Sequence, residues 1–121
     1  MAHAITGEGG VSFYERRTRT LNLCIFGNFP ESPVLERLAA DIDSDGRSSV
    51  QVSHQSRFCV AYGSGGRLQF ATRTGLSEYS IEDVDVGGGW PSLVFDGEGS
   101  AHLAHVANGT LKYAKALGSG D

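Results

Sequence analysis

Hydrophobic and polar residues alternate along most of this chain in short runs that end at glycine or another turn residue. Alternation with a period of two is typical of β-strands, because successive side chains point to opposite faces of a sheet. The middle of the chain predicts four strands at about 48–53, 58–62, 67–72 and 79–86, with a glycine-rich hairpin turn at 63–66. Similar runs precede it at 3–6, 11–15, 20–25 and 34–40, and three more follow within 89–116.

The segment 32–40 leaves two interpretations open. Pro33 stands early in it and good helix formers follow, which is a pattern typical of a short helix. Its position after three predicted strands, however, matches that of 79–86 in the next group. We therefore expect a strand here and an all-β chain.

The three groups of strands are weak copies of one another. A shift of 43 residues superimposes the middle group on the last and places Gly66 on Gly109. A shift of 90 residues superimposes the first group on the last and places Gly7 on Gly97, so the first spacing is 47 residues, the difference between 90 and 43. Residue size repeats in five columns, which are Ile5, Val52 and Phe95; Phe13, Val60 and Leu103; Leu21, Leu68 and Leu111; Leu23, Phe70 and Tyr113; and Cys24, Ala71 and Ala114.

These columns predict how the sheets pack. Large side chains such as Leu68 and Phe70 fall on one face of a strand and the small Ala71 on the other. Sheets built in this way can stack on copies of themselves, and stacked four-stranded units of 40 to 50 residues are the blades of a β-propeller. We therefore predict one repeat domain over 1–121, a partial β-propeller with blades at 1–43, 44–86 and 87–121, the last lacking its outer strand.

The last unit also resembles a known repeat. Its residues match the form P-S-(I/L)-x-x-D-x-x-G-x-x-H followed by L-x-Y-A, which is a β-propeller repeat common in bacterial proteins. The matching residues are Pro91, Ser92, Leu93, Asp96, Gly99, His102, Leu111, Tyr113 and Ala114. The match is partial in the second unit and poor in the first. The resemblance implies the fold, and it implies no activity because propellers of this family serve varied roles.

Three blades are too few for a closed propeller, which needs at least four. An open arc exposes one apolar blade face at each end, and roughly 500 Å² of such surface forgoes about 12 kcal/mol of burial free energy. We therefore expect the chain to assemble with itself, as a dimer of six blades related by a two-fold axis. The alternative is a fragment of a larger propeller with no activity of its own.

Composition narrows the function classes. The net charge of −4 argues against a nucleic-acid partner, which needs a basic surface. No run approaches the roughly 18 apolar residues of a membrane span, and the first residues lack a signal-peptide pattern, so a cytoplasmic location is the default expectation. Cys24 and Cys59 lie in apolar runs and are predicted as buried thiols. No metal or other cofactor is expected.

The candidate ligand site lies on the face formed by the loops between strands. One tryptophan beside arginine and amide side chains suits stacking on a sugar ring, so a glycan or a peptide is the predicted ligand. The alternative is that the tryptophan packs beneath a neighbouring blade. The candidate residues are Trp90, Arg47, Asp45, Arg17 and Asn108.

Other polar residues give weaker signals for chemistry. His102 and His105 are three residues apart on one strand, so they face opposite sides and cannot bind one ion together. His102 matches the histidine of the repeat that the last unit resembles, which implies a hydrogen-bonded structural residue. His105, near the end of its strand, is expected to reach a loop face. Asp45 and Glu15 keep a glycoside-hydrolase-like propeller open as an alternative, since that reaction needs two carboxylates about 5–9 Å apart. The expected function is nevertheless non-enzymatic.

Overall fold

The computed structural model describes residues 2–3, 9–26, 33–40, 48–53, 57–86, 89–107 and 109–116. Within these residues the chain forms eleven β-strands and no helix, so no helix long and apolar enough to cross a membrane occurs there. All pairings between neighbouring strands are antiparallel. The all-β prediction is therefore confirmed.

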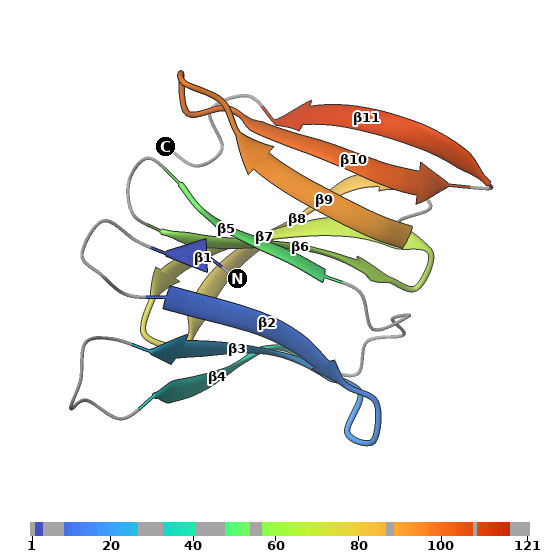
Figure 1. Cartoon of the computed structure of the whole chain (residues 1–121). Helices are drawn as coiled ribbons and strands as arrows, with labels where there is room; N and C mark the ends of the chain where they lie inside the picture. The colour runs from blue at the N-terminus through green and yellow to red at the C-terminus, as the bar shows by residue number, and fades with distance from the viewer. Residues whose placement is uncertain are drawn as a thin grey trace.

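The strands form three separate sheets, each made by one continuous part of the chain (Figure 1). The first sheet contains β1 (Ala2–His3), β2 (Gly9–Glu15), β3 (Thr20–Phe26) and β4 (Val34–Ala39), in that order. The second contains β5 (Ser48–Val52), β6 (Phe58–Ser64), β7 (Arg67–Gly75) and β8 (Glu78–Val86). The third contains β9 (Gly89–Phe95), β10 (Ala101–Ala107) and β11 (Thr110–Ala116).

The segment around Pro33 is extended, as the position of its neighbours predicted, and β4 pairs along β3. Glu36 and Leu38 are buried on one side of β4, while Leu35 and Arg37 are exposed on the other. A helix would place these residues around a cylinder, whereas a strand satisfies the backbone through pairing with β3 and divides the side chains by period two. The helix interpretation is therefore wrong.

The sheets pack one on the next, with the second sheet in the middle of the stack (Figure 1). The first strand of each following sheet lies against the first two strands of the sheet before it: β5 contacts β1 and β2, and β9 contacts β5 and β6. Gly10 of β2 allows the close approach, because a Cβ atom there would lie 2.7 Å from the Phe58 ring of the second sheet.

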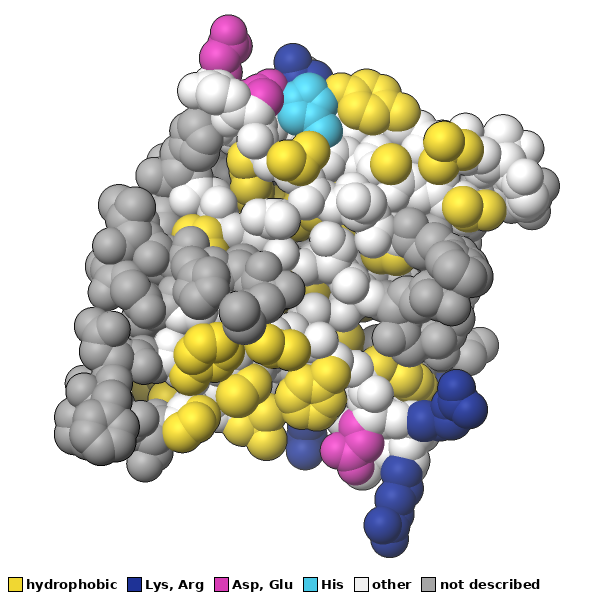
Figure 2. All heavy atoms as spheres, in the orientation of Figure 1, with side chains coloured by type: hydrophobic (Ala, Val, Ile, Leu, Met, Phe, Trp, Pro, Cys, Tyr) yellow, Lys and Arg dark blue, Asp and Glu magenta, His cyan; other side chains and the backbone are white. Residues whose placement is uncertain are grey.

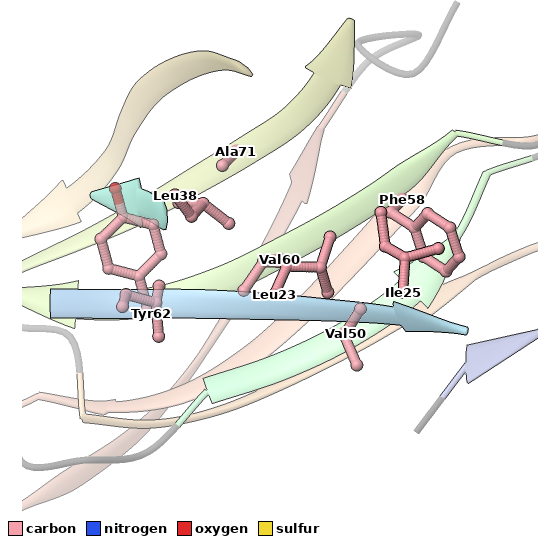
Figure 3. Packing of buried hydrophobic residues seen from close by; sticks show 9 residues of the cluster. Leu23, Ile25, Leu38, Val50, Phe58, Val60, Tyr62 and Ala71 are labelled. Atoms are coloured by element: carbon pink, nitrogen blue, oxygen red, sulfur yellow. The ribbon is translucent and has the colours of Figure 1, made fainter. Parts of the chain in front are cut away.

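Two hydrophobic clusters fill the spaces between the sheets. The cluster between the first and second sheets includes Leu21 and Leu23 from β3 and Val60 and Tyr62 from β6 (Figure 3). The cluster between the second and third sheets contains Cys59, Ala61, Leu68, Phe70, Leu93, Ala101 and Leu103. Strand β6 contributes to both clusters, so it is buried on both sides. The fold thus depends on the middle sheet being covered on both faces.

The structure corrects part of the repeat alignment. In the second and third sheets the predicted shift of 43 holds, since Val60 pairs with Ala71 and Leu103 pairs with Ala114. In the first sheet, Cys24 pairs with Val11 rather than with Phe13, so the column that aligned Phe13 with Val60 is wrong by two residues. The cause is turn length: β2 and β3 are joined by the four residues 16–19, whereas Gly65 and Gly66, at positive φ, suffice between β6 and β7.

Candidate functional site

The outward side of the third sheet carries exposed hydrophobic side chains. Residues of β10 alternate between Ala101, Leu103 and His105, which are buried against the second sheet, and the residues between them, which face away from it. Val94, Leu111 and Tyr113 on this outward side are 57%, 74% and 65% exposed. We call this surface the third open face; its residues are Ser92, Val94, His102, Ala104, Val106, Leu111, Tyr113 and Lys115.

Position in the repeat makes this exposure informative. A shift of 43 residues takes Leu68 to Leu111 and Phe70 to Tyr113. Leu68 and Phe70 are 0% and 1% exposed, because the third sheet covers them. Leu111 and Tyr113 thus occupy positions that are core in the preceding sheet, and no described residue of the chain covers them.

The outward side of the first sheet is hydrophobic as well. Val11, Phe13 and Leu35 are exposed there, and Cys24 is half-buried between Val11 and Leu35. Arg37 lies on the same side of β4, next to Asn22 of β3. We call this surface the first open face, defined by Val11, Phe13, Cys24, Leu35 and Arg37. Figure 2 shows hydrophobic side chains gathered at both ends of the stack.

Three hydrogen-bonded side chains lie on or beside the third open face: Asp96, His102 and Tyr113. Asp96 follows β9 in a tight turn, where its Oδ1 accepts hydrogen bonds from the backbone N–H groups of Glu98 (2.8 Å) and Ser100 (3.0 Å). Its Oδ2 lies 2.7 Å from Nε2 of His102. On the other side of the imidazole, Nδ1 is hydrogen-bonded to the hydroxyl of Tyr113, and the two rings are stacked with centroids 5.7 Å apart.

The hydrogen bond from His102 and those from the backbone of Ser100 and Glu98 lower the pKa of Asp96 to about 2. The carboxyl group is therefore ionised at neutral pH and can only accept hydrogen bonds. It follows that Nε2 of His102 donates a proton to Asp96, while Nδ1 is hydrogen-bonded to the Tyr113 hydroxyl. Asp96 thus orients His102, and His102 fixes the exposed ring of Tyr113 on the open face.

The two histidines of β10 lie on opposite faces, as the alternation predicted. His102 has the hydrogen-bonded role expected for it. His105 does not reach a loop face: it is 0% exposed and points toward the second sheet, because it shares the side of Leu103. That expectation was wrong, since the end of β10 is still covered by the neighbouring sheet.

A second polar cluster joins the first and second sheets. Glu36 of β4 is 2% exposed and accepts hydrogen bonds from Arg73 Nε (2.9 Å) and Nη2 (2.7 Å), the Ser77 backbone N–H (2.9 Å) and the Tyr79 hydroxyl. The hydrogen bond from Arg73, together with those from Tyr79 and Ser77, outweighs burial and lowers the pKa of Glu36 to about 2. Burial and the neighbouring carboxylate raise the pKa of Tyr79. The four hydrogen bonds that the Glu36 carboxylate accepts therefore link the first sheet to the second.

Sequence reasoning missed this cluster. The available signal was a charged residue, Glu36, on the buried side of β4 beside Leu38. Its structural counterpart in the second sheet is Glu82, since Glu36 pairs with Leu23 and Glu82 pairs with the equivalent Phe70. Glu82 is exposed. The counterpart of Arg73 in the third sheet is Ala116, which has no charge to offer.

Most residues of the predicted ligand site are not placed. Asp45, Arg47 and Asn108 lie outside the described residues, and Trp90 belongs to β9 without a described side chain. Arg17 is described and is exposed in the turn 16–19 that joins β2 and β3, between the exposed Arg16 and Arg19. Of the five residues predicted for the ligand site, the structure therefore describes the side chain of Arg17 alone, in the turn 16–19.

Both cysteines are free thiols. Cys59 is buried, as predicted, whereas Cys24 is only half-buried because it lies on the outward side of the first sheet. Burial raises the pKa of the Cys59 thiol to about 11, which makes it unreactive at neutral pH. Among the residues that the structure describes, no group of His, Cys, Asp or Glu side chains has the arrangement needed to hold a metal ion.

Comparison with known proteins assigns no function. No protein-family model matches this chain, and a search of curated proteins finds no match either.

Proposed function

We propose that this chain is a non-enzymatic scaffold and binding module, a partial β-propeller that assembles with a second copy and binds a glycan or peptide on its loop face. The observation that carries the proposal is the exposure of Leu111 and Tyr113 at positions equivalent to the buried Leu68 and Phe70. The three sheets are the first blades of the propeller, and a second copy supplies three more.

The energetics favour assembly. Burying the side chain of a leucine or a phenylalanine stabilises a protein by about 1.5–3 kcal/mol. Leu111, Tyr113 and Val94 at one end and Val11, Phe13 and Leu35 at the other all retain exposed surface in the single chain. An exposed apolar patch that extends over several strands is usually an interaction surface. Two copies cover four such faces at once if they close into a ring.

The ligand part of the proposal rests on the loop residues. The exposed turn 16–19 presents Arg16, Arg17 and Arg19, a basic group that suits carboxylates of an acidic glycan or peptide. Trp90 is the second residue of β9 and would supply the stacking surface. The glycoside-hydrolase alternative, which needs Asp45 and Glu15 about 5–9 Å apart, gains no support, because Glu15 is exposed at the end of β2 and Asp45 lies outside the described residues.

The test is the mass of the purified chain in solution. Sedimentation equilibrium or light scattering at micromolar concentration is expected to give twice the 12.8 kDa of one chain. A stable monomer over this range would overturn the proposed assembly. The ligand part has its own test: a glycan array with the wild type and with Trp90→Ala is expected to show binding that the substitution abolishes, and unchanged binding would remove Trp90 from the site.

A further inference from the structure

We infer, on the basis of the proposed function, that the two copies pair head to tail: the third open face of one copy covers the first open face of the other. The occupant of each open face is thus a second copy of this chain in one orientation. Pairings of two third faces or of two first faces are excluded by the same argument.

The argument begins with the two sides of the second sheet. One side carries Leu68 and Phe70 and is covered by the third sheet; the other carries Val60 and Ala71 and lies on the first sheet. We call the first kind of surface leading and the second kind trailing. Each contact between sheets inside this chain joins one leading surface to one trailing surface.

One of the two open faces is a leading surface and the other is a trailing surface. Leu111 and Tyr113 on the third open face are the counterparts of Leu68 and Phe70, so this face is leading. On the first open face Val11 pairs with Cys24 as Val60 pairs with Ala71, a valine beside a small residue, so this face is trailing. Only a third-on-first pairing repeats the contact that the chain already makes twice.

Strand positions agree with this pairing. In both internal contacts the first strand of the following sheet lies against the first two strands of the preceding one. The same relation would lay β1 of the second copy against β9 and β10 of the first. A two-fold axis then produces both contacts together and leaves no open face, whereas a pairing of two identical faces leaves two faces exposed.

The hydrogen-bonded group of Asp96, His102 and Tyr113 on the third open face is suited to burial. Polar groups lose little on desolvation when they are already hydrogen-bonded. His102 bonds with Asp96 through one ring nitrogen and with Tyr113 through the other, so covering this face leaves none of these three side chains in need of a new partner. The group also holds the Tyr113 ring in one orientation for the incoming sheet.

The experiment uses one variant on each face of the full chain. Leu111→Arg places a charge on the third open face and Phe13→Glu places the opposite charge on the first. Leu76→Arg is the matched control, because Leu76 is 73% exposed in the turn between β7 and β8, away from both faces. Masses are measured by sedimentation for each variant alone and for an equimolar mixture of the two face variants.

Head-to-tail pairing predicts that each face variant alone is monomeric, that Leu76→Arg stays dimeric, and that the mixture recovers dimers. In the mixture one contact joins two unaltered faces and the other joins opposite charges. Recovery also shows that both variants are folded. If mixing fails, the milder pair Leu111→Ala and Phe13→Ala is measured in the same way, and failure of either one to weaken the dimer overturns the inference.

The outcomes separate this inference from the proposed function. If Phe13→Glu remains dimeric while Leu111→Arg is monomeric, third faces pair with each other; the reverse result indicates paired first faces. Either result overturns head-to-tail pairing and the six-blade ring, while self-association of the chain still stands. A monomeric wild type overturns both.

Discussion

The second and third sheets of this protein share a residue pattern but not an environment. Both have Leu and an aromatic residue at matching positions of their third strands, Leu68 with Phe70 and Leu111 with Tyr113. In the second sheet this pair is core, and in the third sheet it is exposed. A different contrast separates the first and second sheets: Glu36 is buried and accepts four hydrogen bonds, whereas its counterpart Glu82 is exposed. Burial of the repeated leucine and aromatic pair is decided by whether another sheet follows, whereas Glu82 is exposed although the third sheet follows the second.

The largest expected effect comes from truncating the aromatic pair. Phe70→Ala is expected to lower the free energy of unfolding by about 3–5 kcal/mol, since it leaves a cavity between two sheets. Tyr113→Ala is expected to change it by less than about 0.5 kcal/mol under conditions where the chain is monomeric. Urea denaturation of both variants at the same protein concentration measures the two losses in the free energy of unfolding. Equal losses would contradict the view that only the second sheet is covered.

A slightly smaller effect is expected for the two glutamates. Glu36→Gln removes the charge that Arg73 and Tyr79 share, and breaking such a buried pair costs about 3 kcal/mol. Glu82→Gln changes an exposed carboxylate and is expected to cost less than about 0.5 kcal/mol. Thermal unfolding followed by circular dichroism compares the two. A Glu82 effect as large as that of Glu36 would show that Glu82 has a buried partner.

Acid should weaken the contact between the first and second sheets. The pKa of Glu36 is lowered from an ordinary value of 4.5 to about 2, so its stabilising contribution is complete above pH 4.5 and is lost as the pH falls toward 2. Asp96, with a pKa lowered from 3.8 to about 2, contributes in the same direction. Urea midpoints measured between pH 6 and pH 2.5 should therefore fall.

The variant Glu36→Gln isolates the part of this acid effect that belongs to Glu36. Its own stability is lower throughout, and the difference from the wild type is expected to shrink as the pH falls below 4.5. A difference that stays constant from pH 6 to pH 2.5 would contradict the lowered pKa.

The smallest effect is expected for Tyr113→Phe. The substitution removes the hydroxyl that bonds with His102 but keeps the ring. In the single chain, Nδ1 of His102 can bond with water in place of that hydroxyl. The unfolding midpoint of the monomer should therefore change little, while the proposed dimer should weaken measurably because Nδ1 of His102 would then be buried without that partner. Sedimentation of the variant against the wild type checks this, and an unchanged dimer would place Tyr113 outside the contact.

Local pattern was enough to predict the strands and much of their pairing. The alternation at 58–62 and 67–72 lies within β6 and β7, and the shift of 43 carried the pairing of Val60 with Ala71 onto Leu103 with Ala114. The same reasoning misplaced Phe13, because a turn of four residues rather than two changes the register of every residue before it. Registers are set by turn length, and turn length is hard to read where the glycine signal is absent.

The candidate site also has features that local spacing could predict and features that depend on a neighbouring sheet. The separation of His102 from His105 followed from their spacing on one strand, since side-chain direction in a strand is a local property. The hydrogen-bonded role of His102 was instead implied by the resemblance of the last unit to a known repeat. The partners of Glu36 could not be foreseen, because Arg73 and Tyr79 come from another sheet about forty residues away, at separations of 37 and 43. The burial of His105 depended equally on a neighbouring sheet.

The sequence by itself determined that this chain is all-β, that its strands alternate large and small faces, and that the pattern recurs after 47 and then 43 residues. These properties depend on backbone pairing and on the direction of neighbouring side chains, which are short-range. Only the tertiary structure decided which of the repeated faces is core and which is open. That decision depends on the number and order of the sheets, because apolar surface is removed from water only where another sheet lies against it.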